Sequence, residues 1–233
     1  MLRETGHAGF PGSHFHEPSL EKWCDYYGLN AAGFDLPADM LRAIFDSARQ
    51  TGSASSDIFG LRLQRDSFDF FVQQLKLLHP SYGSDKERIK KEFGCTLFVH
   101  LTRQNKLDQA ISVVKAMQSG LWHKAPDGTE IERNGMGQEL AYDANAISAE
   151  LTGFEKADDE WKAWFEVEDL EPLRIDYDDL SGSPYTQLSQ ITEMLGFKYE
   201  PSDKNTVPVA KLSDEINRDW ADRFRSDFPE LTY

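Results

Sequence analysis

Arg103 is the residue whose type and position first indicate chemistry in this sequence. It follows an apolar run with the pattern of a buried strand, Leu97 to Val99, and precedes a segment with helical spacing. In an open α/β sheet, ligands bind beyond the carboxyl ends of the strands, where a guanidinium can hold an anion. The alternative is an ordinary strand–helix unit with a solvated arginine. Spacing alone leaves both interpretations open.

The segment after Arg103 has apolar residues at three- and four-residue steps, which predicts an amphipathic helix. These residues are Leu107, Ala110, Ile111, Val114, Met117 and Leu121. Ser112 follows an apolar pair within this stretch. From Arg103 to Lys124 the basic residues outnumber the single acid, Asp108. The segment is therefore locally positive, although the whole chain carries a net charge of −15.

Composition favours one globular domain over residues 1–233. The chain is 39% hydrophobic and 12% aromatic, and its 233 residues suffice for a full core. The net charge of −15 disfavours nucleic-acid binding, which usually needs a basic face. No apolar stretch approaches the length of a transmembrane helix, and no signal-peptide pattern opens the sequence. Cys24 and Cys95 lack a CxxC partner, so we expect reduced thiols and a cytoplasmic protein, with a disulfide left open.

Strand and helix patterns alternate along the chain and predict an α/β fold with a mainly parallel sheet flanked by helices. The expected strands cover residues 58–63, 95–101 and 173–177. Besides the segment after Arg103, the expected helices cover 19–28, 37–48, 68–78, 85–93, 138–168 with a break near Gly153, 185–195 and 213–225. Residues 1–17, 51–57 and 125–137 are expected to be loops, and 208–233 to form the C-terminal helix and tail.

Several stretches of the sequence resemble motifs of a single known family. In chain order they are residues 5–11 (TGHAGFP), 59–63 (FGLRL), 100–133 (HLTRQNKLDQAIS and the residues after it), 161–165 (WKAWF), 171–172 (EP), 177–180 (YDDL) and 220–224 (WADRF). In this order and combination the chain resembles the trehalose 2-sulfotransferase-like family of bacterial carbohydrate sulfotransferases. The resemblance spans nearly the whole chain, although no single stretch is specific.

The resemblance implies a sulfotransferase with a P-loop nucleotide-kinase-like sheet. It implies 3′-phosphoadenosine-5′-phosphosulfate (PAPS) as the sulfuryl donor, and a hydroxyl of a carbohydrate or glycolipid as the acceptor. It also implies that the strand–helix unit 95–124 holds the 3′-phosphate of the donor. Trp122 and His123, expected to end that helix, would then approach the acceptor pocket or a homodimer contact. No His, Cys or Asp cluster has the spacing of a metal site, so no metal is expected.

Four residues are the resulting candidates for donor binding. Arg103 is foremost, Ser112 is second through its hydroxyl, and Lys211 and Arg62 are further candidates. Arg62 could contact the donor or the acceptor. The last three candidates each have a purely structural alternative: for Ser112 a hydroxyl bonded back to its own helix, for Lys211 a solvated side chain, and for Arg62 a pair with an acid such as Asp66.

The general base is harder to place. In the family it is a Glu shortly after the stretch 5–11, and the aligned position here is Ser13. His14, His16 and Glu17 lie within four residues and are the candidates to replace it, with His14 foremost because imidazole titrates near neutral pH. The alternative is that all three are ordinary loop residues.

The family begins with a further strand and a Gly/Ser-rich phosphosulfate-binding loop, which this sequence lacks. We therefore expect an N-terminally incomplete version of the fold. A nucleotide kinase is disfavoured, because the sequence contains no GxxxxGK[ST] motif. The predicted function is PAPS-dependent sulfuryl transfer. The alternative is a non-catalytic protein of the same fold that acts as a binding or interaction module.

Overall fold

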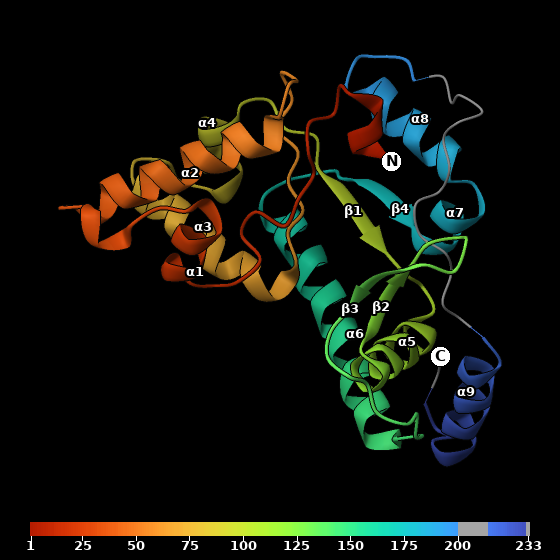
Figure 1. The fold of residues 1–233 in the computed structure, drawn as a ribbon. Helices are drawn as coiled ribbons and strands as arrows, with labels where there is room; N and C mark the ends of the chain where they lie inside the picture. The colour runs from red at the N-terminus through yellow and green to blue at the C-terminus, as the bar shows by residue number, and fades with distance from the viewer. Residues whose placement is uncertain (200–213, 232–233) are drawn as a thin grey trace. The chain divides into compact units, whose positions relative to one another are not determined.

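We describe residues 1–199 and 214–231 of the chain in a computed structural model (Figure 1). The chain divides into two compact units. Of the described residues, unit 1 comprises 1–98, 163–173 and 188–199, and unit 2 comprises 99–162, 174–187 and 214–231. The interpretation of the whole chain as one domain stays a prediction.

Unit 1 is mainly helical. Its elements are η1 (Leu2–Thr5), α1 (Leu20–Tyr27), η2 (Ala31–Gly33), α2 (Pro37–Ser53), α3 (Arg65–Leu78) and α4 (Asp85–Phe93), with the end of α6 and most of α8 (Pro184–Met194). Side-chain caps explain where two of these helices begin. Ser19 accepts the N–H of Lys22 at α1, and Ser84 forms a reciprocal capping box with Glu87 at α4. Both starts agree with the sequence expectation.

Aromatic rings form the core of unit 1. The ring of Phe15 lies 4.8 Å from those of Trp23 and Phe45 and 5.0 Å from that of Phe71, centroid to centroid. All four residues are buried. Rings of this size supply much of the apolar area that stabilises a small core. Phe15 therefore fixes the loop that carries the candidate base residues.

Unit 2 holds the strands. Its elements are β1 (Val99–Thr102), α5 (Lys106–Ser119), β2 (Leu121–Lys124), β3 (Glu130–Arg133), most of α6 (Ala144–Val167), β4 (Leu173–Asp176), α7 (Tyr177–Gly182) and α9 (Glu215–Asp227). β1 pairs with β4, and β2 pairs antiparallel with β3. Figure 1 shows the arrows of β1 and β4 pointing the same way. The prediction of a mixed α/β fold is confirmed, with a parallel sheet that is small, and the antiparallel pair was not predicted.

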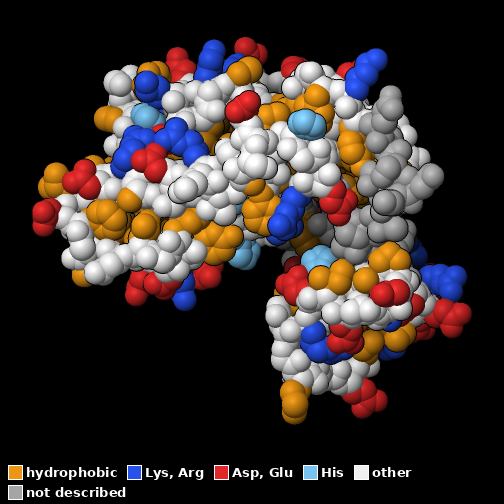
Figure 2. Space-filling model, turned by 45° about the horizontal axis from the view of Figure 1, so that its top comes forward, with side chains coloured by type: hydrophobic (Ala, Val, Ile, Leu, Met, Phe, Trp, Pro, Cys, Tyr) orange, Lys and Arg blue, Asp and Glu red, His pale blue; other side chains and the backbone are white. Residues whose placement is uncertain are grey.

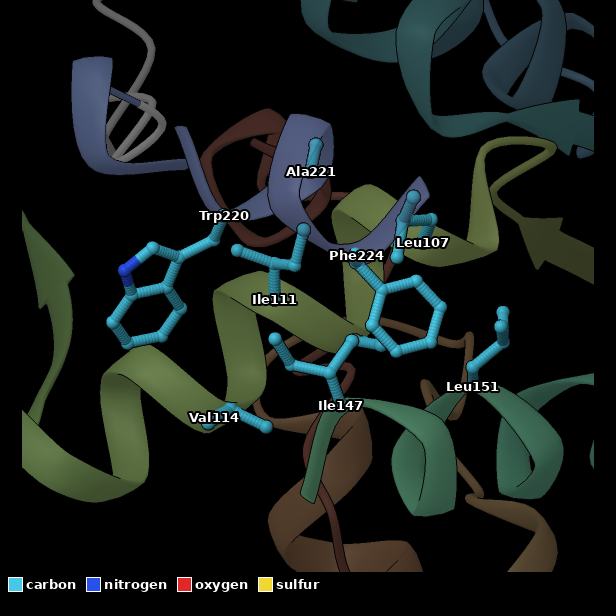
Figure 3. Packing of buried hydrophobic residues seen from close by; sticks show 9 residues of the cluster. Leu107, Ile111, Val114, Ile147, Leu151, Trp220, Ala221 and Phe224 are labelled. Atoms are coloured by element: carbon cyan, nitrogen blue, oxygen red, sulfur yellow. The ribbon is translucent and has the colours of Figure 1, made fainter. Parts of the chain in front are cut away.

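Helices α5, α6 and α9 share one apolar core in unit 2 (Figure 3). Its buried members are Leu107, Ala110, Ile111, Val114, Ile147, Leu151, Trp220, Ala221 and Phe224. The predicted apolar stripe of α5 is thus confirmed for its first four positions. It is wrong for Met117, which is 58% exposed, and for Leu121, which lies on β2.

The segment after α5 is a hairpin, and two predictions there are wrong. Trp122 and His123 do not end the helix but lie on β2, and residues 130–133 form β3 rather than a loop. The helix ends at Ser119, and its C-cap is Gly120, whose φ of 72° favours glycine. A Cβ at this position would also lie 2.5 Å from the Asn134 carbonyl oxygen. The glycine therefore allows the chain to return closely past the helix end.

Residues 58–63 do not form the predicted strand. Within the described residues this segment makes only an isolated bridge, between Leu61 and Gly12. The N–H of Gly60 donates to the Gly52 carbonyl at the end of α2, so a helix end stands where a strand partner would be needed.

Several helix limits also differ from those predicted. α2 continues to Ser53, α3 starts at Arg65 and not after Asp66, and α6 starts at Ala144 and runs through Gly153 without a break.

Charges are mixed on the surface drawn in Figure 2, where Lys and Arg side chains lie among Asp and Glu side chains. Positive potential on this face therefore comes from individual residues and not from a continuous basic surface. None of the helices in residues 1–199 and 214–231 is long and apolar enough to cross a membrane.

Candidate functional site

Arg103 follows directly on the last residue of β1 and stands before α5. Asn105 caps that helix by accepting the N–H of Asp108 at 2.9 Å. The sharp strand-to-helix connection places Arg103 at the carboxyl end of the strand, as the sequence predicts. Its side chain is nevertheless only 10% exposed. A charged group that is this buried needs compensation, because leaving water costs it several kcal/mol.

The partners of Arg103 compensate its charge only in part. Its Nη2 faces the Asp108 carboxylate at 3.4 Å, which is longer than the ~2.7–2.9 Å of a close charge-assisted hydrogen bond. Its guanidinium carbon lies 4.9 Å from the ring centroid of Tyr177. Its Nε is buried and has no hydrogen-bond partner among residues 1–199 and 214–231. A buried, under-compensated guanidinium with an unused donor is the environment that an anion would complete.

Asp176 connects the end of β4 to the turn that carries Arg103. One carboxylate oxygen accepts the N–H of Gln104 at 3.2 Å, and the other caps α7 by accepting the N–H of Asp178 at 2.8 Å. The same residue thus fixes the turn after Arg103 and the helix that begins with Tyr177. Sequence reasoning did not assign Tyr177 or Asp176 to the site. The available signal was an aromatic residue directly after a parallel strand, at the edge where ligands bind.

Other basic residues of this segment are more fully neutralised. Lys106 pairs with Asp158 at 2.5 Å, and Lys115 pairs with Asp214 at 2.6 Å. Burial favours the neutral form of Asp214, but the hydrogen bond and charge of Lys115 outweigh it and lower the pKa of this carboxyl. Arg103 therefore contributes more to the local positive potential than these lysines do.

Ser112 lies on α5, and its hydroxyl bonds back to its own helix, which is the structural alternative given above. Its hydroxyl donates to the Asp108 carbonyl at 2.7 Å and accepts from the Asn217 side-chain amide at 3.3 Å. Binding a phosphate would require the hydroxyl to turn away from the Asp108 carbonyl. Lys211, the third candidate for donor binding, lies outside the described residues.

The remaining candidates belong to unit 1. His14 is 1% exposed, and its two ring nitrogens lie 3.1 Å from the Tyr27 hydroxyl and 3.1 Å from the Phe10 carbonyl oxygen. Burial lowers the pKa of His14, against the opposing effect of the Phe10 carbonyl. His16 and Glu17 follow in the same loop and are exposed.

Arg62 contacts the position that aligns with the family's base. Its Nε donates to the Ser13 hydroxyl at 2.9 Å, and its side chain is exposed. The contact joins two residues 49 positions apart in sequence. It therefore places Arg62 next to the loop with the candidate base residues, and its contact with donor or acceptor stays a prediction.

A cavity of about 340 Å³ lies in unit 1 beside the stretch 5–11. Among its lining residues are Arg3, Phe10 and the hydroxyl-bearing Ser53 and Ser55. The Arg3 guanidinium lies 4.4 Å from the Phe10 ring centroid. Hydroxyl groups beside an aromatic ring are a chemistry that suits a sugar.

The structure thus places the candidates in two groups. Arg103 and Ser112 belong to unit 2, with Tyr177 and Asp108 beside Arg103. The second group, in unit 1, consists of His14, His16, Glu17 and Arg62. In the described part of the chain, no group of three or more His, Cys, Asp or Glu side chains is arranged to hold a metal ion.

Comparisons with known proteins give one consistent result. A family model described as Stf0 sulphotransferase matches residues 1–227. The chain is 26% identical over 184 residues to the trehalose 2-sulfotransferase of Mycolicibacterium smegmatis, covering 78% of this chain and 66% of that protein. It is also 26% identical over 191 residues to the trehalose 2-sulfotransferase of Mycobacterium tuberculosis, covering 80% and 67%. The chain spans about two thirds of the length of these curated relatives.

Proposed function

The chain belongs to the Stf0 sulphotransferase family, and from this premise we propose that it transfers a sulfuryl group from PAPS to a hydroxyl of a carbohydrate or glycolipid. The donor supplies an activated sulfuryl group on a phosphate leaving group. We also propose that the chain has the P-loop nucleotide-kinase-like fold that the family resemblance implies. A homodimer and a cytoplasmic location stay predictions.

The observation that carries the proposal is the incomplete compensation of the buried Arg103 charge. Its guanidinium is buried, its contact to Asp108 is long, and its Nε lacks a hydrogen-bond partner in the described part of the chain. These features fit a phosphate group, whose oxygens accept hydrogen bonds from guanidinium donors in the same plane. We assign Arg103 as the main ligand of the 3′-phosphate of the donor. Ser112 and Lys211 are assigned as further donor contacts, and Arg62, which contacts Ser13, is assigned to contact the donor or the acceptor.

The acceptor hydroxyl must lose a proton during the transfer, and a general base accepts it. We assign this role to the loop with His14, His16 and Glu17. His14 would first have to release one of its two ring contacts. His16 and Glu17 are exposed and need no such release. The cavity beside Phe10 is the proposed acceptor pocket, because it offers hydroxyl groups and an aromatic ring.

Binding of 3′-phosphoadenosine 5′-phosphate (PAP), the spent donor, tests the donor site. We expect Arg103→Ala to weaken binding by about 1.5–3 kcal/mol, or roughly ten- to more than a hundredfold, because a charge-assisted contact is lost. Isothermal titration calorimetry measures the effect. Arg218→Ala is the matched control, because Arg218 is an exposed arginine of the same unit, paired with Glu215. Equal affinity of the Arg103 variant and the native chain would remove Arg103 from the site.

Transfer of labelled sulfate from PAPS to trehalose and to a panel of sugars and glycolipids tests the reaction. If the base is one of the two exposed residues, replacing both His16 and Glu17 abolishes transfer while PAP affinity stays unchanged. Full activity of that double variant would exclude both residues and leave His14 as the base.

A non-catalytic binding protein of the same fold is the second candidate function. The observation that favours it is Ser13, a residue that cannot act as a carboxylate base, at the aligned position of the family's glutamate. PAP binding without transfer to any acceptor of the panel would support this candidate.

A further inference from the structure

Two side chains beside Arg103, those of Tyr177 and Asp108, differ in how they contact its guanidinium. The guanidinium carbon of Arg103 lies over the Tyr177 ring, 4.9 Å from its centroid. Asp108 takes one donor, at 3.4 Å. We propose that these two side chains set the anion affinity of Arg103: Tyr177 raises it by fixing the guanidinium, and Asp108 lowers it by competing with the anion. This inference rests on the proposed function for the identity of the natural ligand.

The role of Tyr177 follows from the geometry of a guanidinium. A ring face that contacts a guanidinium uses none of its N–H groups in a conventional hydrogen bond, and phosphate oxygens bind to those N–H groups. Arginine side chains lose about 2 kcal/mol of rotamer entropy when they are fixed. Because the ring already restricts Arg103, less of this cost remains when an anion binds. Tyr177 is therefore a positioning residue, which acts through Arg103.

Asp176 keeps that ring in place. It accepts the N–H of Gln104 and caps the helix that begins with Tyr177, so the turn after Arg103 and the aromatic ring are tied to one carboxylate. Without this tie, the end of β4 and the turn after β1 would be joined less rigidly. Tyr177 then depends on Asp176 for its position over the guanidinium.

Asp108 has the opposite effect. Its carboxylate is 34% exposed and its distance to Arg103 Nη2 is long, so the pair is a loose one. A phosphate bound to Arg103 would lie close to this negative charge and would be repelled by it. The backbone of Asp108 makes two hydrogen bonds that do not involve its carboxylate. Its N–H donates to the Asn105 side chain, and its carbonyl accepts from the Ser112 hydroxyl. An Asp108→Asn change therefore removes the charge and keeps these backbone bonds.

Two variants with opposite expected effects test the proposal, with PAP as the probe in calorimetry. We expect Tyr177→Leu to weaken PAP binding about tenfold, and Tyr177→Phe to restore it, because only the ring face is required. We expect Asp108→Asn to strengthen PAP binding about threefold. Asp179→Asn is the control, since it removes the same charge from an exposed position of α7 and should leave the affinity unchanged.

The Arg103→Ala background separates positioning from a general structural effect. If both residues act through Arg103, the effects of Tyr177→Leu and Asp108→Asn on PAP affinity vanish in that background. If either effect persists there, or if Asp179→Asn matches Asp108→Asn, the proposal is overturned. Melting curves of all variants verify that the chain is folded.

An anion without the nucleotide distinguishes failure of this inference from failure of the proposed function. The side-chain Nε–H resonance of Arg103 is followed by ¹⁵N NMR while inorganic phosphate is added. If PAP does not bind but phosphate shifts this resonance, and the two variants change the response as expected, the proposed function fails and the inference stands. If PAP binds and neither variant changes its affinity, the inference fails and the donor assignment stands. If neither anion acts on Arg103, both fail.

Discussion

At the scale of single residues, the two most prominent sequence candidates lie in contrasting environments. Arg103 and His14 are both buried, but their polar atoms differ. No described residue offers the Nε of Arg103 a hydrogen-bond partner. Both ring nitrogens of His14, in contrast, lie within hydrogen-bonding distance of a partner, the Tyr27 hydroxyl or the Phe10 carbonyl oxygen. A donor without a partner favours a ligand, and a fully bonded ring favours a structural role. The same degree of burial therefore supports opposite interpretations of the two residues.

Burial of His14 predicts how stability depends on pH. Its pKa is lowered in the folded chain from about 6.5, so the unfolded chain binds the proton more readily. The stabilisation is fully present above that pH, and it is lost as the pH falls toward the lower pKa of the folded state. We expect His14→Gln to flatten the decrease in the free energy of unfolding between about pH 7 and pH 5.

Urea unfolding at a series of pH values measures this dependence. His16→Gln is the control, because His16 is exposed in the same loop. His100 is a second buried histidine with a pKa lowered mainly by burial, so part of the decrease should remain in the His14 variant. A pH dependence identical to that of the native chain would contradict the prediction.

At the scale of elements, contacts from distant segments complete what local caps begin. The start of α4 has its own capping box, and Glu168 adds a second cap from the segment after α6. The Glu168 carboxylate accepts the N–H of Asp85 at 3.1 Å and that of Lys86 at 2.7 Å. The local sequence predicted the limits of α4, but nothing in it indicated this second cap.

Glu168→Ala should therefore destabilise the chain by about 1–3 kcal/mol, because it leaves two N–H groups at a helix start without partners and removes a charge that the helix dipole favours. The midpoint of urea unfolding measures the loss. Glu166→Ala is the matched control, since Glu166 is an exposed glutamate of the same helix end. Equal midpoints for the two variants would show that the cap contributes nothing.

At the scale of the whole molecule, an anionic donor must approach a chain with a net charge of −15. Exposed charges act over about a Debye length, whereas the attraction of the buried Arg103 acts at contact. Added salt should therefore screen the general repulsion more than the local attraction. We expect the association rate of PAP to rise as NaCl is increased from about 0.01 M to about 0.15 M.

Stopped-flow measurements on the native chain determine this rate. Adenosine, which carries no phosphate, is the control ligand and should show no such dependence. An association rate for PAP that falls steeply with salt would mean that a positive field steers the donor, contrary to the prediction.

Membership in the sulphotransferase family could be predicted from the sequence, because it depends on short motifs in a fixed order. The same holds for helices such as α4 and for the apolar stripe of α5, since caps and periodicity involve residues a few positions apart. The hairpin at β2 and β3 and the missing strand at 58–63 could not be predicted in this way. Pairing of strands depends on partner segments, which local patterns do not specify.

The sequence by itself determined that a basic residue ends a strand and precedes a helix, in a chain with the motifs of one family. Only the tertiary structure decided what surrounds that residue. The turn after Arg103 is held by Asp176, 72 positions away from Gln104, and the ring of Tyr177 comes with it. The physical reason is distance along the chain: spacing rules act over one or two helical turns, whereas the environment of a charge depends on the packing of remote segments.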